Sequence, residues 1–205
     1  MVTGNTVIDA LFQIREIPYK PSDDRLTDIP LDKRILLVTT HRRENFGKPL
    51  LAICEAIRKI AALYSRDIQI VYPVHLNPNV FKVVHGFLHS LSNITLLEPL
   101  DYLSWVHLMD KSHLLLTDSG GLQEEAPSLG KPVLVLRDIT ERPEAVKAGT
   151  VKIVGTDRDR IVEEVNLLLN DSSTYNKMSN SINPYGDGHS AEKICKALET
   201  SVNSN

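Results

Sequence analysis

Six short apolar segments, each followed by a stretch with helical periodicity, constrain the fold of this 205-residue chain more than any other feature. The segments are rich in Val, Ile and Leu, as strands buried on both faces of a parallel sheet are. Because parallel strands need crossover connections, their alternation with helices predicts an α/β fold with a doubly wound, Rossmann-like parallel sheet. Ligand-binding residues are then expected in the loops at the carboxyl ends of the strands. The predicted strands are residues 35–39, 68–72, 94–97, 113–117, 132–136 and 151–154.

The beginning of the chain stands outside this alternation. Residues 6–14 predict a short helix, and residues 18–24 are polar and include Pro18 and Pro21, as a linker would. We therefore expect residues 1–30 to form an interdomain helix and linker. Residues 31–205 are expected to form the Rossmann-like domain, closed by helices over residues 159–169 and 190–198. A chain that opens in this way is expected to be one domain cut from a longer protein.

Charge, hydropathy and cysteine content exclude several classes of function. The net charge of −3 provides no positive field for nucleic acid. The chain has no run of eighteen apolar residues and no basic-then-apolar N-terminus, so we expect a cytoplasmic protein with no membrane partner. Cys54 and Cys195 have no metal-ligand spacing, so no metal site is expected. A dinucleotide fingerprint, a P-loop and a nucleophile elbow are also absent from the sequence, and we expect no cofactor.

The strongest local motif is Thr-Asp-Ser-Gly-Gly-Leu-Gln-Glu-Glu-Ala at residues 117–126. It places two glycines between a strand and a helix, where free N–H groups and the helix dipole favour an anion. Ser119 and Gly120 are candidate phosphate-binding residues, and Glu125 is near enough to accept hydrogen bonds from ribose hydroxyls. The alternative is that Asp118 or Ser119 only caps the helix, while the two glutamates favour its dipole.

Charged and aromatic residues in three other loops are candidates for the same site. His41 and Arg42 follow the first strand and can bind a diphosphate, unless this loop is only solvated and Glu44 pairs locally with an arginine. Arg142 follows the fifth strand and can hold a phosphate or sugar hydroxyl. His75 is either a ligand-binding residue or a satisfied polar core residue. Trp105 either stacks on a base or packs in the core.

Six segments in the same order together resemble the non-hydrolysing UDP-N-acetylglucosamine 2-epimerases of bacteria and archaea. The resemblance covers essentially the whole chain, and six motifs in one order are highly specific. Members of this family have two domains in a glycosyltransferase-B-like fold and are about twice as long. The chain therefore resembles the C-terminal half of such a fold. The six segments are residues 2–10, 40–45, 73–78, 117–127, 141–144 and 183–188.

The resemblance implies a reaction and its ligands. UDP is eliminated from UDP-GlcNAc and adds back on the other face of the sugar to give UDP-ManNAc, a precursor for polysaccharide biosynthesis. His41 matches the family histidine implicated in catalysis. Arg42 and His75 match positions that contact a second, allosteric UDP-GlcNAc in bacterial members. The residues implied to bind UDP or UDP-sugar are Leu100 (through its backbone), Trp105, Ser119, Gly120, Glu125 and Arg142.

The resemblance also implies partners that this chain would need. The carboxylates usually credited with proton transfer lie in the family's N-terminal domain, and the complete enzymes are expected to be homodimers. The expected function is therefore the nucleotide-binding domain of an epimerase with little or no activity alone. Two alternatives are a glycosyltransferase-B donor domain, which shares the glycine turn and the ribose-binding glutamate, and a non-catalytic UDP-sugar-binding module.

Overall fold

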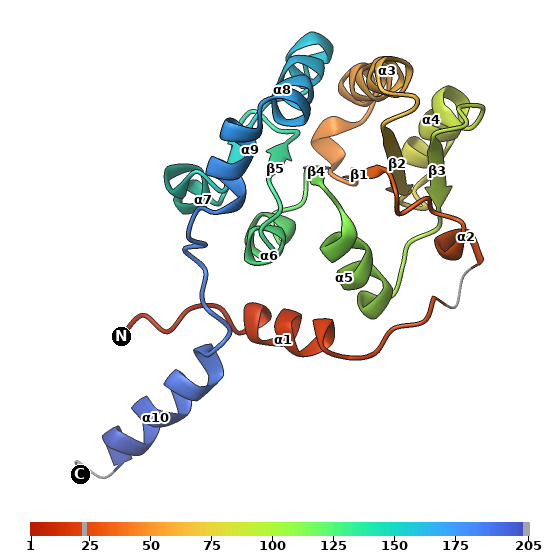
Figure 1. Cartoon of the computed structure of the whole chain (residues 1–205). Coiled ribbons are helices and arrows are strands. Elements are labelled where there is room, and N and C mark those ends of the chain that lie inside the picture. The colour runs from red at the N-terminus through yellow and green to blue at the C-terminus, as the bar shows by residue number, and fades with distance from the viewer. Residues whose placement is uncertain (22–23, 203–205) are drawn as a thin grey trace.

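The computed structural model describes residues 1–21 and 24–202, and a six-stranded parallel sheet lies at its centre (Figure 1). The strand order is β3-β2-β1-β4-β5-β6, and every neighbouring pair is parallel. This order confirms the predicted doubly wound, Rossmann-like sheet, with its topological switch point between β1 and β4. The strands are β1 (Arg34–Thr39), β2 (Ile68–Pro73), β3 (Ile94–Leu97), β4 (Leu114–Thr117), β5 (Val133–Val135) and β6 (Val151–Ile153).

Helices cover both faces of the sheet because most residues of β1, β2, β4 and β5 are apolar and buried. On one face lie α3 (Lys48–Leu63), α4 (Pro78–Leu88) and α8 (Arg158–Asn170), and on the other α5 (Tyr102–Lys111) and α6 (Leu122–Ser128) (Figure 1). The apolar stripe of α3, which includes Ile53, Ile57 and Ile60, has no exposed surface. The remaining elements are α2 (Asp24–Thr27), η1 (Arg43–Asn45), α7 (Pro143–Ala148) and α9 (Ser172–Ser179).

The predicted strands agree with the observed ones to within one residue at each end. Helix α9 was not predicted, and none of its residues is buried, so it lacks the apolar period that marks the other helices. The signal available in the sequence is its cap. The Asp171 carboxylate accepts hydrogen bonds from the backbone N–H groups of Ser173 and Thr174.

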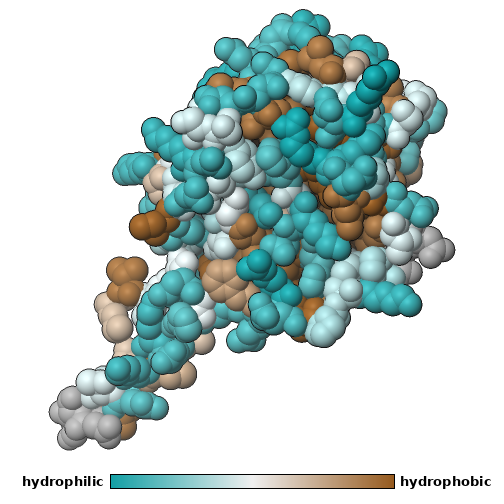
Figure 2. Space-filling view, viewed as in Figure 1, coloured by the Kyte–Doolittle hydropathy of each residue, from teal (hydrophilic) through white to brown (hydrophobic). Residues whose placement is uncertain are grey.

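The two ends of the chain meet through α1 (Thr6–Arg15) and α10 (Ser190–Val202). Helix α1 packs against α5 and α6 and buries Ile8 and Leu11 completely. The Asp9 carboxylate accepts hydrogen bonds from the backbone N–H groups of Ser190 and Ala191, which begin α10. Helix α10 then projects away from the body of the domain (Figures 1 and 2). Within the predicted linker, Ser22 and Asp23 lie outside the described residues. Among the residues described, no helix has the length and apolarity needed to cross a bilayer.

Helix α5, which carries Trp105, depends on a capping aspartate. The Asp101 carboxylate accepts a hydrogen bond of 2.8 Å from the Ser104 backbone N–H, and this bond is the main reason why the pKa of Asp101 is lowered. We expect Asp101→Ala to reduce the free energy of unfolding by about 1 kcal/mol near neutral pH. Because the folded pKa lies below the usual value of 3.8, the difference is full above that pH and shrinks as the pH falls below it.

Urea unfolding of both proteins across this pH range measures the difference. Asp32→Ala is the control, since Asp32 precedes β1 and caps no helix. An unfolding free energy that does not change in Asp101→Ala would contradict the capping role.

Candidate functional site

The loops after β1 and β4 meet at the topological switch point, and the buried carboxylate of Asp118 joins them. This carboxylate accepts hydrogen bonds from the backbone N–H groups of His41 (3.1 Å) and Arg42 (2.9 Å) and from the Asn45 side-chain amide (2.9 Å). His41 Nδ1 lies 3.2 Å from Asp118 Oδ1. Asp118 has no exposed surface, so these donors replace the water that an ionised carboxylate needs. The arrangement fixes the His41 loop relative to the glycine turn.

The glycine turn is not closed by a side-chain cap. Gly121 is the N-cap residue of α6, and no side chain there accepts a hydrogen bond from the helix. The alternative that Asp118 or Ser119 only caps this helix is therefore wrong, because the Asp118 carboxylate binds the neighbouring loop instead. A hydrogen bond from the buried side chain of Gln123 fixes the turn, because the Gln123 amide donates to the Ser119 carbonyl.

A hollow of about 250 Å³ opens at the carboxyl ends of β1, β2 and β4. It contains several of the predicted site residues, contributed by separate segments of the chain. Pro73, Pro99 and Leu122 complete an apolar floor beside the polar groups. A hollow with apolar walls and a few convergent polar groups is typical of a small-molecule site. The predicted residues that line it are His41, His75, Leu100, Trp105 and Ser119.

The core-residue alternative is wrong for His75 but not for Trp105, and both residues line the hollow. His75 is exposed, so it is not a buried core residue, and its ring centroid lies 6.3 Å from that of His41. Trp105 is half-buried, packs against the core between the sheet and α5, and also lines the hollow. Trp105 therefore contributes both to core packing and to the wall of the hollow.

Arg42 lies over the glycine turn. A Cβ atom added to Gly120 would stand 3.4 Å from Arg42 Nη2, so the guanidinium passes directly above this glycine. Arg42 Nη2 also donates to Glu141 at 3.1 Å, whereas its Nε is buried and makes no hydrogen bond within the described residues. Glu44 pairs with Arg137, which follows β5, and not with an arginine of its own loop. The alternative of a local pair between Glu44 and an arginine of its own loop is therefore wrong.

Glu125 is a buried carboxylate with little compensation. Its exposed fraction is 9%, and within the described residues its carboxylate accepts one hydrogen bond, from the Tyr102 hydroxyl at a long 3.4 Å. Burial raises the pKa of Glu125 to about 7, and the neighbouring Glu124 raises it further. Glu125 Oε1 lies near Gly121, since a Cβ atom added to that glycine would stand 3.9 Å away. A ligand that donates hydroxyl groups here would supply the hydrogen bonds that the carboxylate lacks.

Arg142 is held beside α6 by groups that the sequence did not single out. Its guanidinium forms an ion pair with Glu124, whose other oxygen accepts a hydrogen bond of 2.6 Å from Asn5. Its backbone N–H donates to Thr140, whose hydroxyl donates to Gln123. Asp118, Glu124 and Gln123 all belong to the motif at residues 117–126. Their roles follow from long-range contacts that no spacing reveals.

Most of the predicted residues thus form two groups, while Arg42 lies over Gly120 in the glycine turn. His41, His75, Leu100, Trp105 and Ser119 line the hollow, whereas Glu125 and Arg142 lie along α6.

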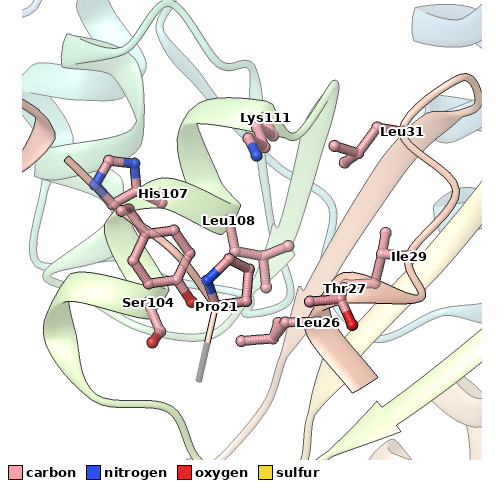
Figure 3. Close-up of a pocket in the computed structure, with 10 residues that line it drawn as sticks. Pro21, Leu26, Thr27, Ile29, Leu31, Ser104, His107, Leu108 and Lys111 are labelled. Atoms are coloured by element: carbon pink, nitrogen blue, oxygen red, sulfur yellow. The ribbon is translucent and has the colours of Figure 1, made fainter. Parts of the chain in front are cut away.

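A second hollow, of about 260 Å³, lies between α5 and a wall formed by residues 19–21 and 26–31 (Figure 3). It contains Tyr19, Ile29 and His107, and none of the predicted site residues.

Comparison with known proteins gives the family of this fold and site. The family model for UDP-N-acetylglucosamine 2-epimerase matches residues 1–199. The chain belongs to the UDP-N-acetylglucosamine 2-epimerase family. It is 54% identical to the UDP-N-acetylglucosamine 2-epimerase of Escherichia coli K12, over 97% of this chain and 54% of that protein. The chain therefore spans about half the length of the curated relatives that it matches.

Solved structures of epimerases have the same fold. The Neisseria meningitidis enzyme bound to UDP-GlcNAc is 46% identical, with a TM-score of 0.89 over 98% of this chain and 55% of that one. The Staphylococcus aureus MnaA–UDP complex is 45% identical, also with a TM-score of 0.89, over 98% of this chain and 54% of that one. These matches confirm the resemblance and the assignment to half of a glycosyltransferase-B-like fold.

Proposed function

We propose that this chain is the nucleotide-binding half of an enzyme that interconverts UDP-GlcNAc and UDP-ManNAc. In this proposal Ser119 and Gly120 hold the diphosphate, and Glu125 accepts hydrogen bonds from the ribose hydroxyls. Leu100 and Trp105 lie beside the uracil, and Arg142 holds a phosphate or the sugar. Arg42 and His75 belong to the neighbouring site for a second UDP-GlcNAc.

The observation that carries the proposal is the convergence of four separate segments on one hollow. His41, His75, Trp105 and Ser119 come from different loops and helices, yet all line it. The site also combines a glycine turn, over which the Arg42 guanidinium lies, with a buried carboxylate that accepts one long hydrogen bond. Relatives with the same fold were crystallised with UDP-GlcNAc or UDP, which supports the choice of ligand.

The proposed reaction is an elimination followed by an addition. The C2 proton and the UDP group leave the sugar to give 2-acetamidoglucal, and UDP then adds back as C2 is protonated on the opposite face. His41 lies next to the turn that would hold the departing diphosphate. It can therefore stabilise the charge that develops there or donate a proton to it.

The proposal also assigns the parts of the chain and its partners. Residues 1–30 would connect this domain to the N-terminal half of the enzyme, and residues 31–205 would form the UDP-sugar-binding domain. Ile194, Leu198 and Val202 form an exposed apolar stripe at helical spacing on the projecting α10, which suits contact with that other half. We place the complete enzyme in the cytoplasm, as a homodimer, with no cofactor.

Two alternative functions would require the same hollow to bind a UDP-sugar. A glycosyltransferase-B donor domain would transfer the sugar to an acceptor, and a non-catalytic module would bind UDP-sugar without turnover. The family match favours the epimerase over the transferase. Assays of sugar transfer and of 2-epimerisation, with the N-terminal half of a relative supplied in trans, would separate the three functions.

We expect the chain alone to bind UDP, with a dissociation constant weaker than about 10 μM, because half of the surface that would enclose the ligand is absent. Isothermal titration calorimetry at nucleotide concentrations up to about 1 mM measures the affinity. Gly120→Ala should weaken binding about tenfold, because the added methyl group blocks the approach of the diphosphate to the backbone.

Gly86→Ala is the matched control for this substitution. Gly86 lies in α4, and an added Cβ atom there meets nothing within 4 Å. If the folded wild-type chain binds no UDP at the highest concentration, or if both variants lose affinity equally, the proposed site is wrong.

A further inference from the structure

We propose that Asp118 is the positioning residue of this site and fixes His41 in one tautomer, with the proton on Nδ1 and Nε2 facing the hollow. This inference rests on the proposed function, because the diphosphate is the group that Nε2 would meet. His41 Nδ1 lies 3.2 Å from Asp118 Oδ1, and a carboxylate oxygen can only accept. A hydrogen on the ring nitrogen nearest Asp118 makes this close approach attractive, whereas a lone pair there would face the carboxylate oxygen and be repelled.

The two carboxylate oxygens of Asp118 make different contacts. Oδ2 accepts from the Arg42 backbone N–H and from the Asn45 amide, both at 2.9 Å. Oδ1 faces the His41 ring and shares the His41 backbone N–H with Oδ2. Because the Asn45 amide also donates to the Leu136 carbonyl, the carboxylate is tied to both neighbouring strands. It cannot turn away from the ring without breaking this network.

The ring of His41 thus lies against Asp118 at Nδ1, and its side chain is also part of the lining of the hollow. Its side chain is 38% exposed, whereas that of Asp118 is not exposed at all. In the neutral ring Nε2 then carries a lone pair, which would repel a phosphate oxygen. When a diphosphate binds, we expect one proton from solvent to bind to Nε2. The resulting imidazolium donates to Asp118 through Nδ1 and to the diphosphate through Nε2, and Asp118 stabilises its charge.

His75, in the same hollow, provides a built-in comparison. Its Nδ1 accepts a hydrogen bond of 3.1 Å from the Asn77 backbone N–H, so its proton must lie on Nε2. Two histidines with ring centroids 6.3 Å apart are therefore expected to have opposite tautomers. A general solvent effect would not produce this difference.

The test is ¹⁵N NMR of the histidine side chains in the folded chain, at a pH where both rings are neutral. We expect a protonated-type shift for Nδ1 of His41 and for Nε2 of His75. When UDP is added, Nε2 of His41 should move to the protonated-type shift, while Nδ1 stays protonated. A neutral His41 with its hydrogen on Nε2 would overturn the proposal without any variant.

The Asp118→Asn variant tests the same inference, because it should reverse the tautomer of His41. The amide oxygen can keep the Arg42 and Asn45 contacts of Oδ2, which puts the NH₂ group opposite His41 Nδ1 and moves the ring hydrogen to Nε2. UDP should then cause no protonation change at His41. Asp171→Asn, at the capping residue of α9, is the control for the loss of a carboxylate and should leave both tautomers unchanged.

The outcomes separate this inference from the proposed function. If the wild-type chain has the expected tautomers but UDP shifts no resonance of the hollow, the UDP site is wrong and the positioning role of Asp118 stands. If UDP binds and His41 keeps its hydrogen on Nε2, the positioning role is wrong. If Asp118→Asn fails to fold, the two wild-type measurements still decide the question.

Discussion

The purified chain should exchange the C2 proton of UDP-GlcNAc with solvent at least about a thousandfold more slowly than a complete two-domain relative. Removal of that proton and its return on the opposite face require a base and an acid on two sides of the sugar, each worth roughly 10²- to 10⁴-fold in rate. His41 is the candidate on this side, and one histidine cannot reach both faces of the ring. Closure over the ligand also requires a second domain to exclude water.

Deuterium incorporation at C2, followed by NMR, measures this rate directly. The Escherichia coli enzyme, 54% identical over this region, is a suitable positive control. Activity should rise when the N-terminal half of that enzyme is added in trans, and His41→Ala should abolish the gain. Full exchange by the chain alone would show that the acid and base lie among its own residues. Glu141 and Glu144 would then be the first candidates.

We expect the Glu125 carboxylate to stabilise the complex with ligand but to lower the free energy of unfolding of the unliganded chain. Burial raises its pKa from 4.5 to about 7, so the ionised form is disfavoured in the folded chain. A carboxyl whose folded pKa lies above its unfolded value destabilises the fold once the pH exceeds that unfolded value, and the full cost applies above the folded value. We therefore expect Glu125→Gln to raise the free energy of unfolding by about 1–3 kcal/mol near pH 8, with no gain below about pH 4.

The adjacent glutamate is the matched control and should respond with the opposite sign. Glu124 is also buried, but it pairs with Arg142 and accepts from Asn5. Glu124→Gln should lower the free energy of unfolding by about 1–3 kcal/mol, because it leaves the Arg142 guanidinium without its charge partner. Chemical denaturation at about pH 8 and pH 4 measures both variants. Destabilisation by Glu125→Gln near pH 8 would contradict the uncompensated burial of this carboxyl.

Ligand binding provides the other half of the Glu125 prediction. Glu125→Ala should weaken UDP by about 1.5–3 kcal/mol, the range for a hydrogen bond to a charged group, and should leave pyrophosphate unchanged or slightly tighter. Pyrophosphate lacks a ribose and loses nothing when the carboxylate is removed. Equal weakening of both ligands would mean that Glu125 acts on the phosphate or on the fold.

The sequence by itself determined the sheet and the edge of the sheet at which several predicted site residues lie. Runs such as residues 35–38 and 114–116 are apolar at every position, and a parallel sheet covered on both faces buries such strands. The alternation with helices then fixed the crossovers, and the crossovers fixed the edge at which His41 and Ser119 had to meet. These inferences succeeded because periodicity and connection rules are local properties of the chain.

Tertiary structure alone decided what the polar residues of the glycine motif do. A sequence with Asp118 before two glycines is equally compatible with a helix cap and with a loop anchor. The carboxylate binds His41, Arg42 and Asn45 because β1 and β4 are neighbours in the sheet.

The sequence also does not distinguish the adjacent residues Glu124 and Glu125. Arg142 and Asn5 reach only the first, so one is paired and the other is buried without compensation. Partners 119 residues apart, such as Asn5 and Glu124, leave no trace in spacing, because only the folded chain brings them together.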